Sequence, residues 1–210
     1  MLQKEKYWNK VASEKEFTTP FKLDLFKNYV DNKAKILDYG CGYGRTLNFL
    51  GKNGFRDLYG VDLSENMIKR AKEENPSMKF KVVKQNKLKL EDDSFDAVLL
   101  LAVLTCVISN EEQDIMMNEI KRVLKPNGII YINDFLLNDD ERNIKRYNKF
   151  DDKYNCYGIF ELDEGAILRH YDEKRIEELI KDFDTIEYEK VVYTTMNGNN
   201  SNGFNYLGKI

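Results

Sequence analysis

A short segment of the sequence combines an acidic residue with three closely spaced glycines, in the order Asp38-Tyr39-Gly40-Cys41-Gly42-Tyr43-Gly44. Glycine lets the backbone turn sharply and approach a ligand without the clash that a Cβ atom would cause. A helix that begins after such a turn offers free N–H groups and a positive partial charge. Asp62 follows Gly42 by 20 residues (62 − 42) and ends the next predicted strand, where a carboxylate can accept hydrogen bonds from ribose hydroxyls. This arrangement predicts a nucleotide-type ligand, and the structural alternative is a tight turn followed by a solvent-facing aspartate.

The residues around the glycines narrow the kind of nucleotide. The dinucleotide fingerprint GxGxxG needs a glycine at position 45, where the chain has Arg45, and the phosphate-binding pattern GxxxxGK[ST] is absent. Asp38 lies two residues before the first glycine, where it would repel a pyrophosphate and attract an ammonium group. The segment therefore favours a ligand with an ammonium group over NAD or ATP.

The elements that must hold these residues alternate between apolar strands and helices. Strands are predicted at 35–39, 58–61, 79–83, 97–102 and 129–134, and helices at 45–52, 64–74 and 109–124. Ser64 and Ser109 are predicted N-caps, and Glu112 completes a capping-box spacing with Ser109. After residue 134 the alternation ends, and Asp172 then caps a helix that precedes two strands, 185–194 and 204–209, joined by a polar loop. The pattern predicts an α/β, Rossmann-like fold: a mostly parallel seven-stranded sheet with helices on both faces and a C-terminal antiparallel hairpin.

Length and composition set bounds on this fold. The chain has 210 residues, 42% hydrophobic and 33% charged, which suits one domain better than two. Its longest apolar run, 97–104, has about eight residues where a spanning helix needs about 20, and its first ten residues are polar. The net charge of −3 gives no positive electrostatic field that would attract nucleic acid or an anionic membrane. The three cysteines have no CxxC spacing, which favours reduced thiols over disulfides or a zinc site. We therefore expect a cytoplasmic protein without nucleic-acid, membrane or metal partners, and the oligomeric state stays open.

Four segments, taken in order and spacing, resemble the class I S-adenosylmethionine (SAM)-dependent methyltransferases of small-molecule type: ILDYGCGYGR, LYGVDLSENMIKRA, SFDAVLLLAVL and EIKRVLKPNGIIYI. The resemblance covers residues 35–134. It implies SAM as the cofactor and S-adenosylhomocysteine (SAH) as its product. It also implies cofactor contacts at matching positions: the methionine end at Asp38, Gly40, Gly42, Gly44 and Leu101, the ribose at Asp62, and the adenine at Leu63 and Met67.

Two positions depart from the pattern of that family. Members commonly have an acidic residue after the third strand that binds the adenine amino group, where this chain has Lys84-Gln85-Asn86. We expect Gln85 or Asn86 to replace it through a side-chain carbonyl. Many members also have paired histidines after the fourth strand, where this chain has Thr105 and Cys106, so the resemblance carries over no base there.

The resemblance and the change of pattern after residue 137 describe a single methyltransferase domain, 1–210, in four segments. These are an N-terminal cover (1–34), a SAM-binding core (35–137), a substrate-cap insertion (138–170) and a C-terminal helix and hairpin (171–210). The expected reaction transfers the methyl group of SAM to an oxygen or nitrogen, with carbon also allowed, of a small molecule. The alternatives are a non-catalytic SAM-binding regulatory protein and an NAD-dependent oxidoreductase.

The cap segment carries the candidate acceptor-binding and catalytic residues. Its basic side chains stand at helical spacing among aromatic residues: Arg142, Lys145, Arg146 and Lys149. Such a stripe predicts recognition of an acidic or aromatic substrate, or a solvated helix face above packed aromatics. His170 is the only histidine of the chain and the candidate general base, since imidazole titrates near neutrality. The alternative for His170 is a packing role at the start of a helix.

Overall fold

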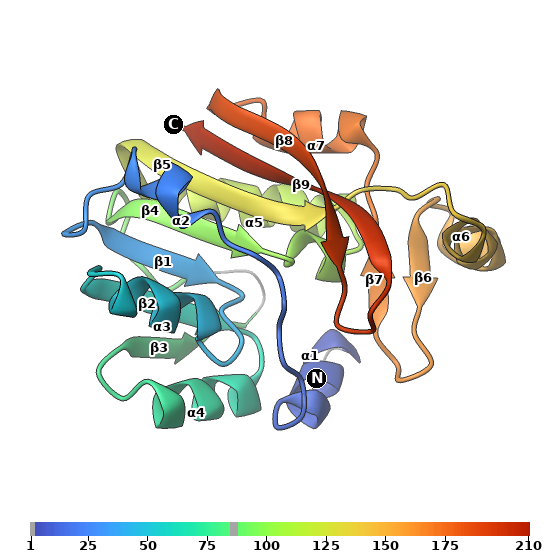
Figure 1. The fold of residues 1–210 in the computed structure, drawn as a ribbon, viewed down its shortest axis with the longest axis horizontal. Helices are drawn as coiled ribbons and strands as arrows, with labels where there is room; N and C mark the ends of the chain where they lie inside the picture. The colour runs from blue at the N-terminus through green and yellow to red at the C-terminus, as the bar shows by residue number, and fades with distance from the viewer. Residues whose placement is uncertain (1–2, 85–87) are drawn as a thin grey trace.

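The computed structural model describes residues 3–84 and 88–210, and its main element is a seven-stranded sheet in the order β3-β2-β1-β4-β5-β9-β8 (Figure 1). The strands are β1 (Lys35–Tyr39), β2 (Asp57–Asp62), β3 (Lys79–Val82), β4 (Phe95–Leu101), β5 (Leu124–Phe135), β8 (Asp184–Thr194) and β9 (Asn200–Lys209). The first five run parallel, and β9 pairs antiparallel with both β5 and β8. This architecture confirms the predicted Rossmann-like fold and its antiparallel C-terminal hairpin.

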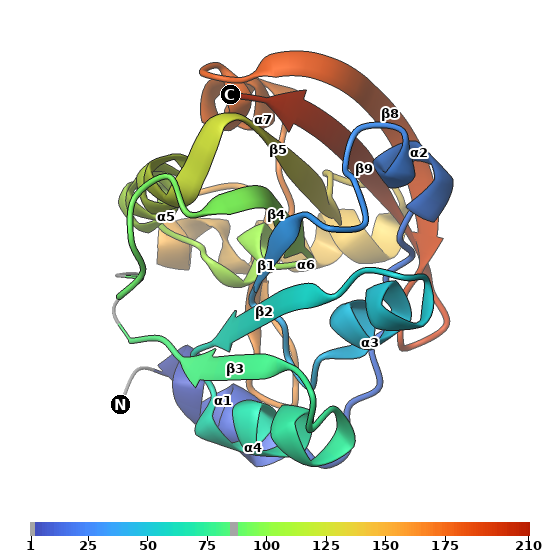
Figure 2. The same cartoon turned by 90° about the vertical axis from the view of Figure 1, so that its left-hand side faces the viewer.

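Helices cover both faces of the sheet (Figures 1 and 2). One face is covered by α2 (Leu23–Lys27), α3 (Arg45–Lys52) and α4 (Glu65–Glu74), the other by α5 (Asn110–Val123) and α7 (Glu173–Ile180). The first helix, α1 (Gln3–Val11), lies beside the start of α4, where Asn9 hydrogen-bonds with Ser64 and Asn66. None of the helices in the described part of the chain is long and apolar enough to cross a membrane.

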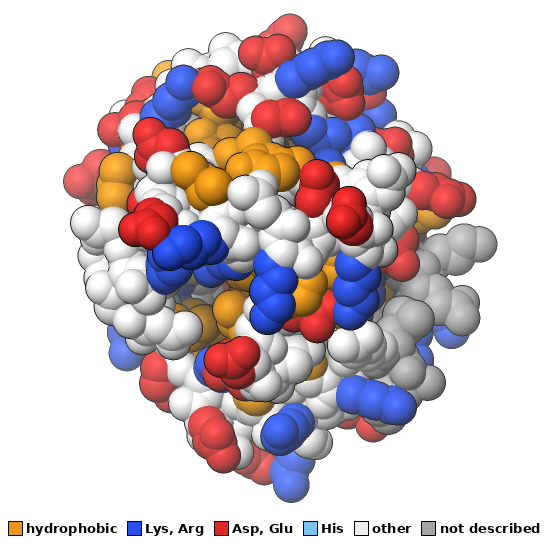
Figure 3. Space-filling view, turned by 90° about the vertical axis from the view of Figure 1, so that its right-hand side faces the viewer, with side chains coloured by type: hydrophobic (Ala, Val, Ile, Leu, Met, Phe, Trp, Pro, Cys, Tyr) orange, Lys and Arg blue, Asp and Glu red, His pale blue; other side chains and the backbone are white. Residues whose placement is uncertain are grey.

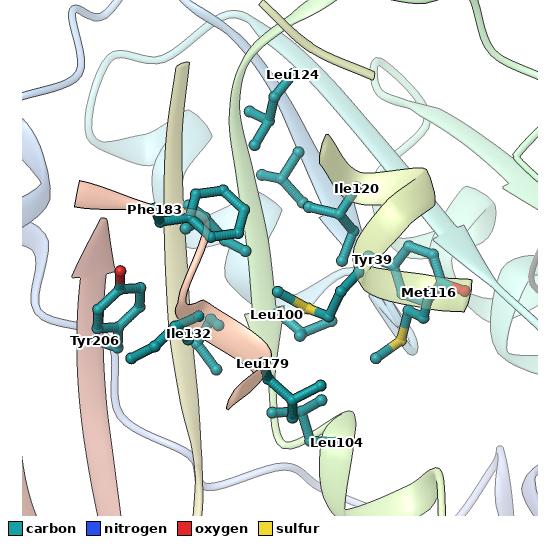
Figure 4. Close-up of a cluster of buried hydrophobic side chains, with 14 of the residues drawn as sticks. Tyr39, Leu100, Leu104, Met116, Ile120, Leu124, Ile132, Leu179, Phe183 and Tyr206 are labelled. Carbon is teal, nitrogen blue, oxygen red and sulfur yellow. The ribbon is translucent and has the colours of Figure 1, made fainter. Parts of the chain in front are cut away.

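Alternate residues of the strands belong to two apolar layers, one on each face of the sheet. In β1, Ile36 packs toward α2 and α3 whereas Leu37 packs toward α5, and both are fully buried. Figure 4 shows the layer between the sheet and α5 and α7, with side chains of Leu100, Met116, Ile120, Ile132 and Leu179. Full burial of one such side chain contributes about 1.5–3 kcal/mol. The layers therefore fix β1 and β4, whose carboxyl ends carry the predicted site.

Side-chain caps stabilise three predicted helix starts. Ser64, Ser109 and Asp172 each accept a hydrogen bond from the backbone N–H three residues later, at 3.1, 3.4 and 2.8 Å. Each cap contributes about 1 kcal/mol. Only the serine half of the predicted capping box forms, because the Glu112 carboxylate pairs with Lys4 at 2.7 Å.

Two strand starts differ from the prediction by four or five residues. β5 begins at Leu124 instead of residue 129, because Leu124 already pairs with Phe95 before an irregularity shifts the register. β9 begins at Asn200 instead of residue 204, since the polar residues 200–203 pair with β8. Their composition is typical of a loop, but the neighbouring strand supplies partners for their backbone groups.

The segment 138–170, in which the sequence shows no regular pattern, contains α6 (Glu141–Tyr154) and a small hairpin of β6 (Ile159–Glu161) and β7 (Ile167–Arg169). It lies beyond the end of the main sheet, on the right of Figure 1. The four basic residues do not act alike, because Arg146 covers the Phe160 ring at 3.5 Å whereas the other three are exposed. Figure 3 shows acidic and basic side chains interspersed on this side of the molecule. The contacts of α6 favour a solvated helix face above packed aromatic residues over a basic stripe that recognises a substrate.

Candidate cofactor and acceptor site

A hollow with about 1070 Å³ of empty space, part of it open solvent, lies at the carboxyl ends of β1, β2 and β4. Parallel sheets of this type bind their ligands at this edge. Most of the predicted cofactor residues line it, namely Asp38, Gly40, Gly42, Asp62, Leu63, Met67 and Leu101. Gly44 does not, because it caps α3 and a Cβ there would meet Phe80 and Asn75. Gln85 and Asn86 lie outside the described residues, so the adenine contact stays a prediction.

The glycine turn brings the backbone against its neighbours more closely than a side chain allows. Gly40 and Gly42 have φ values of +77° and +52°, in the left-handed region that favours glycine. A Cβ on Gly40 would lie 2.4 Å from Val103, and one on Gly42 would lie 2.3 Å from the Phe17 ring. Val103 and Phe17 therefore favour glycine at these two positions, and the close approach of a ligand there stays a prediction.

Asp62 is held at the end of β2 by backbone donors on both carboxylate oxygens. Gly42 N–H donates to Oδ2 at 2.9 Å and Ser64 N–H donates to Oδ1 at 2.8 Å. Burial raises the pKa of Asp62, and these backbone hydrogen bonds oppose the rise. Each oxygen keeps a further lone pair, and the residue lines the hollow. Asp62 can therefore accept hydrogen bonds from a pair of hydroxyl groups.

Asp38 has a different environment, although it lies in the same wall. It is only 2% exposed, and within residues 3–84 and 88–210 no hydrogen bond is found to its carboxylate. Burial raises the pKa of Asp38 to about 7, the nearby Arg45 opposes this, and Asp62 adds to it. A buried carboxylate in this state gains most from a cation placed beside it. The position suits an ammonium group of a ligand.

The N-terminal segment forms a roof over the glycine turn. Phe17 stacks on Tyr43 with ring centroids 5.2 Å apart, and its backbone N–H donates to the Tyr43 hydroxyl at 3.1 Å. Trp8 packs edge-on against Phe17, and Arg45 donates a hydrogen bond to the carbonyl of Thr19. Trp8, Phe17 and Thr19 also line the hollow. The roof thus consists of residues from the predicted cover, whose extent as a functional segment stays a prediction.

One buried carboxylate beside the hollow is not singled out by the sequence. Asp134 is fully buried near the end of β5, and its Oδ1 accepts backbone N–H bonds from Thr105 at 3.1 Å and Phe135 at 2.8 Å. Burial raises the pKa of Asp134 to about 7 against these backbone donors. The segment 101–106 that it holds includes Ala102 with φ +54° and lines the hollow. The only available signal was an acidic residue at the end of a predicted strand.

The far end of the hollow is apolar apart from one imidazole. Its walls include side chains from β5, from the β6–β7 hairpin and from the turn between β8 and β9, namely Phe135, Leu168, His170 and Met196. Of these, the sequence singles out only His170. Its ring is 5% exposed and stacks on Phe135 at 5.4 Å with an interplanar angle of 19°. Burial holds the pKa of His170 well below its ordinary range, and the positive charges of Arg146 and Arg142 lower it further.

Comparison with known proteins supports one family. The family model described as "Methyltransferase domain" matches residues 37–132. A crystal structure of a SAM-dependent methyltransferase from Methanosarcina mazei superposes with a TM-score of 0.85 and 27% identity, over 90% of this chain and 98% of that chain. Both comparisons support the class I SAM-dependent methyltransferase family for this chain. This family implies SAM as the methyl donor.

Curated relatives of this methyltransferase differ in the acceptors that their names state. The eEF1A lysine and N-terminal methyltransferase of Mus musculus is 31% identical over 139 residues, 58% of this chain. The 2-methyl-6-phytyl-1,4-hydroquinone methyltransferase of Synechocystis sp. is 31% identical over 110 residues, 51% of this chain. The chain spans 20% of the length of the first relative and 34% of the second. The acceptor of this methyltransferase therefore has to be argued from its own site.

The residues of the hollow fit the cofactor that the family uses. Asp38 offers a buried carboxylate to an ammonium group, and Asp62 offers two oriented oxygens to ribose hydroxyls. The glycine turn lines the same hollow, and a Cβ on Gly40 or Gly42 would collide with Val103 or Phe17, which line it too. The fit rests on charge and on close approach, which are independent features of the wall.

Proposed function

We propose that this methyltransferase transfers the methyl group of SAM to an oxygen or nitrogen atom of a small molecule, with carbon as a further option. The observation that carries this proposal is that one roofed hollow includes both the cofactor end and the apolar end of the site. The same hollow contains the carboxylates of Asp38 and Asp62 at one end and the apolar walls around Leu168 at the other. A small acceptor can enter such a space whole, whereas a protein side chain has to reach in from outside.

The residues of the chain act mainly by binding and orientation. SAM supplies a methyl group on a sulfonium that is already a good leaving group, so the protein has to align the acceptor and exclude water. Asp38 would hold the ammonium group and Asp62 the ribose hydroxyls. Leu63 and Met67 would flank the adenine, and Leu101 would lie beside the methionine part. Gln85 or Asn86 stays the expected partner of the adenine amino group.

The test is methyl transfer from radiolabelled SAM in a cell extract that is afterwards separated into small molecules and macromolecules. We expect label in the small-molecule fraction, and much less of it at limiting SAM when Asp62→Ala protein replaces the native one. Label confined to the protein fraction would contradict the small-molecule proposal and would agree with the acceptor named for the mouse relative. SAM binding without any transfer would favour the regulatory alternative.

A thermal-shift panel of SAM, SAH, NAD and ATP tests the cofactor separately. A ligand at about 100 times its dissociation constant stabilises the folded protein by about 2.7 kcal/mol. We expect shifts with SAM and SAH. A shift with NAD alone would favour the oxidoreductase alternative.

A further inference from the structure

The amide of Asn138 has one orientation because backbone groups fix both of its ends. The backbone N–H of Asn202 donates to Oδ1 at 2.7 Å, and Nδ2 donates to the carbonyl of Leu136 at 2.9 Å. Exchanging the amide oxygen and nitrogen would set two acceptors together at one end and two donors at the other. The second hydrogen of Nδ2 therefore faces two groups, Nδ1 of His170 and Oγ of Ser201, each at 3.1 Å.

The contact that decides the protonation of Nδ1 in His170 is therefore the one with Tyr147. The hydroxyl of Tyr147 lies 2.7 Å from the same Nδ1 and itself accepts the backbone N–H of Asn138 at 3.3 Å. Its own hydrogen is thus free to point at Nδ1. Because Nδ1 accepts, it carries no proton, and a neutral imidazole must then carry its proton on Nε2.

The charged groups that face His170 keep the ring neutral. Burial is the largest cause of its lowered pKa, Arg146 and Arg142 add to it, and only Asp140 opposes. Phe135 and Phe160 pack on the ring, at 5.4 and 4.9 Å between centroids. No described residue hydrogen-bonds with Nε2. This atom is also not among the fully buried polar atoms without a partner, so it is accessible, and His170 lines the hollow. The free N–H is therefore available to a molecule bound in the hollow that His170 lines.

We propose that His170 is a fixed hydrogen-bond donor to the methyl acceptor, and that the acceptor is a mainly apolar molecule with a carbonyl, phenolate or carboxylate oxygen that takes this bond. This inference rests on the small-molecule function proposed above and replaces the general-base role that the sequence suggests for His170. An Nε2 that carries a proton has no lone pair with which to remove one. An ammonium group would meet an N–H donor and two nearby arginines at this end, and both disfavour it.

The tautomer can be measured directly, because the chain contains one histidine. In a long-range ¹H–¹⁵N correlation spectrum of protein with ¹⁵N-labelled histidine, we expect a protonated Nε2 and a bare Nδ1 throughout about pH 6 to 8. A proton on Nδ1, or formation of imidazolium within that range, would overturn the proposal. No variant is needed, so folding of mutants does not limit the test.

Acceptor chemistry is tested with two probes that share a ring, benzoate and benzylamine, added to the SAH complex. We expect benzoate to bind about tenfold or more tightly than protonated benzylamine, and to shift the Nε2–H resonance. His170→Gln keeps an N–H close to the position of Nε2 and should retain benzoate binding, whereas His170→Leu should lose it about tenfold. Melting curves of both variants identify loss of fold.

Two outcomes count against the donor role: equal binding of both probes to the native protein, and unchanged benzoate binding in folded His170→Leu protein. These are distinct from failure of the proposed function. Transfer of label only to macromolecules would leave the tautomer spectrum intact, whereas the wrong tautomer with continued small-molecule methylation would remove this inference alone.

Discussion

Replacing Asp38 by asparagine should stabilise the ligand-free protein at high pH and weaken SAM binding at the same time. The amide has nearly the shape of the carboxyl but cannot ionise. Asp38 is 2% exposed, and burial raises its pKa from 3.8 to about 7. The folded chain therefore holds this proton more tightly than the unfolded chain. The stability that the proton contributes is complete below pH 3.8 and is lost as the pH rises to about 7.

The size of the effect follows from the same two values. The difference between pKa 3.8 and about 7 corresponds to about 4 kcal/mol lost above neutrality. The Asp38→Asn variant avoids this loss but leaves amide hydrogens unpaired in a buried place, at a cost of about 1–3 kcal/mol. We expect a net gain of about 1–3 kcal/mol at about pH 8 and a net loss of about 1–3 kcal/mol below about pH 4, where only the cost of the unpaired amide remains. A missing charge-assisted bond to the ammonium group should weaken SAM binding about tenfold or more.

The assay is urea unfolding without ligand at about pH 8 and at about pH 4. SAM binding is measured by calorimetric titration on the same preparations. Asp57→Asn is the matched control, because Asp57 begins β2 at the opposite edge of the sheet and its side chain is 43% exposed. It should change neither quantity appreciably. An Asp38→Asn protein that is less stable than the native one at about pH 8 and binds SAM equally well would refute the reasoning.

Three further substitutions probe other parts of the wall. Asp62→Ala should weaken SAM binding by about 1–3 kcal/mol in calorimetry, since ribose hydroxyls lose their acceptor; normal binding would move the ribose elsewhere. Gly42→Ala and Gly54→Ala both place a Cβ at positive φ, but only the first meets Phe17, at 2.3 Å, whereas nothing lies within 4 Å of the second. Both should therefore lower the melting point, and only Gly42→Ala should also lower SAM affinity; equal affinities would contradict the close-approach argument. Asp134→Ala should destabilise the fold by about 2–4 kcal/mol in urea unfolding, because two backbone N–H groups lose their acceptor, whereas Asp134→Asn should cost less, because its Oδ1 keeps both donors although its Nδ2 replaces an oxygen that has no partner. Equal losses in the two variants would show that the accepting oxygen is not what matters.

The sequence predicts well those parts of the molecule that depend on neighbours close along the chain. The glycine turn, its preceding strand and Asp62 follow from spacing alone, because one strand–turn–helix–strand unit contains them all. Gly44 is a residue for which this reasoning from spacing fails. Its conformation is that of its two companions, but its missing side chain faces Phe80 of β3 instead of the hollow. The direction of that face is set by a strand that the motif does not contain.

The acceptor end depends on contacts that are distant in sequence, and the sequence therefore predicts it poorly. Leu168 and Met196 reach the hollow only because the small hairpin and the β8–β9 turn are placed there by tertiary pairing. The chemistry of His170 is a stronger example. Residue type suggests a base, but its tautomer depends on an amide that is oriented by Asn202, which lies 64 residues from Asn138. No local pattern records that bond.

The two ends of the hollow have opposite hydrogen-bonding character, and this bears on how an acceptor would be oriented. Asp38 and Asp62 present accepting oxygens at the cofactor end, whereas His170 offers a donor at the other. On the proposed function, an acceptor whose oxygen turned toward the carboxylates would face repulsion and lose its bond to His170. Either penalty alone is of the size that separates tight from weak binding partners. The acceptor would then be oriented by the fixed hydrogen-bonding groups at the two ends of the hollow. Methyl transfer would depend on this alignment more than on a general base.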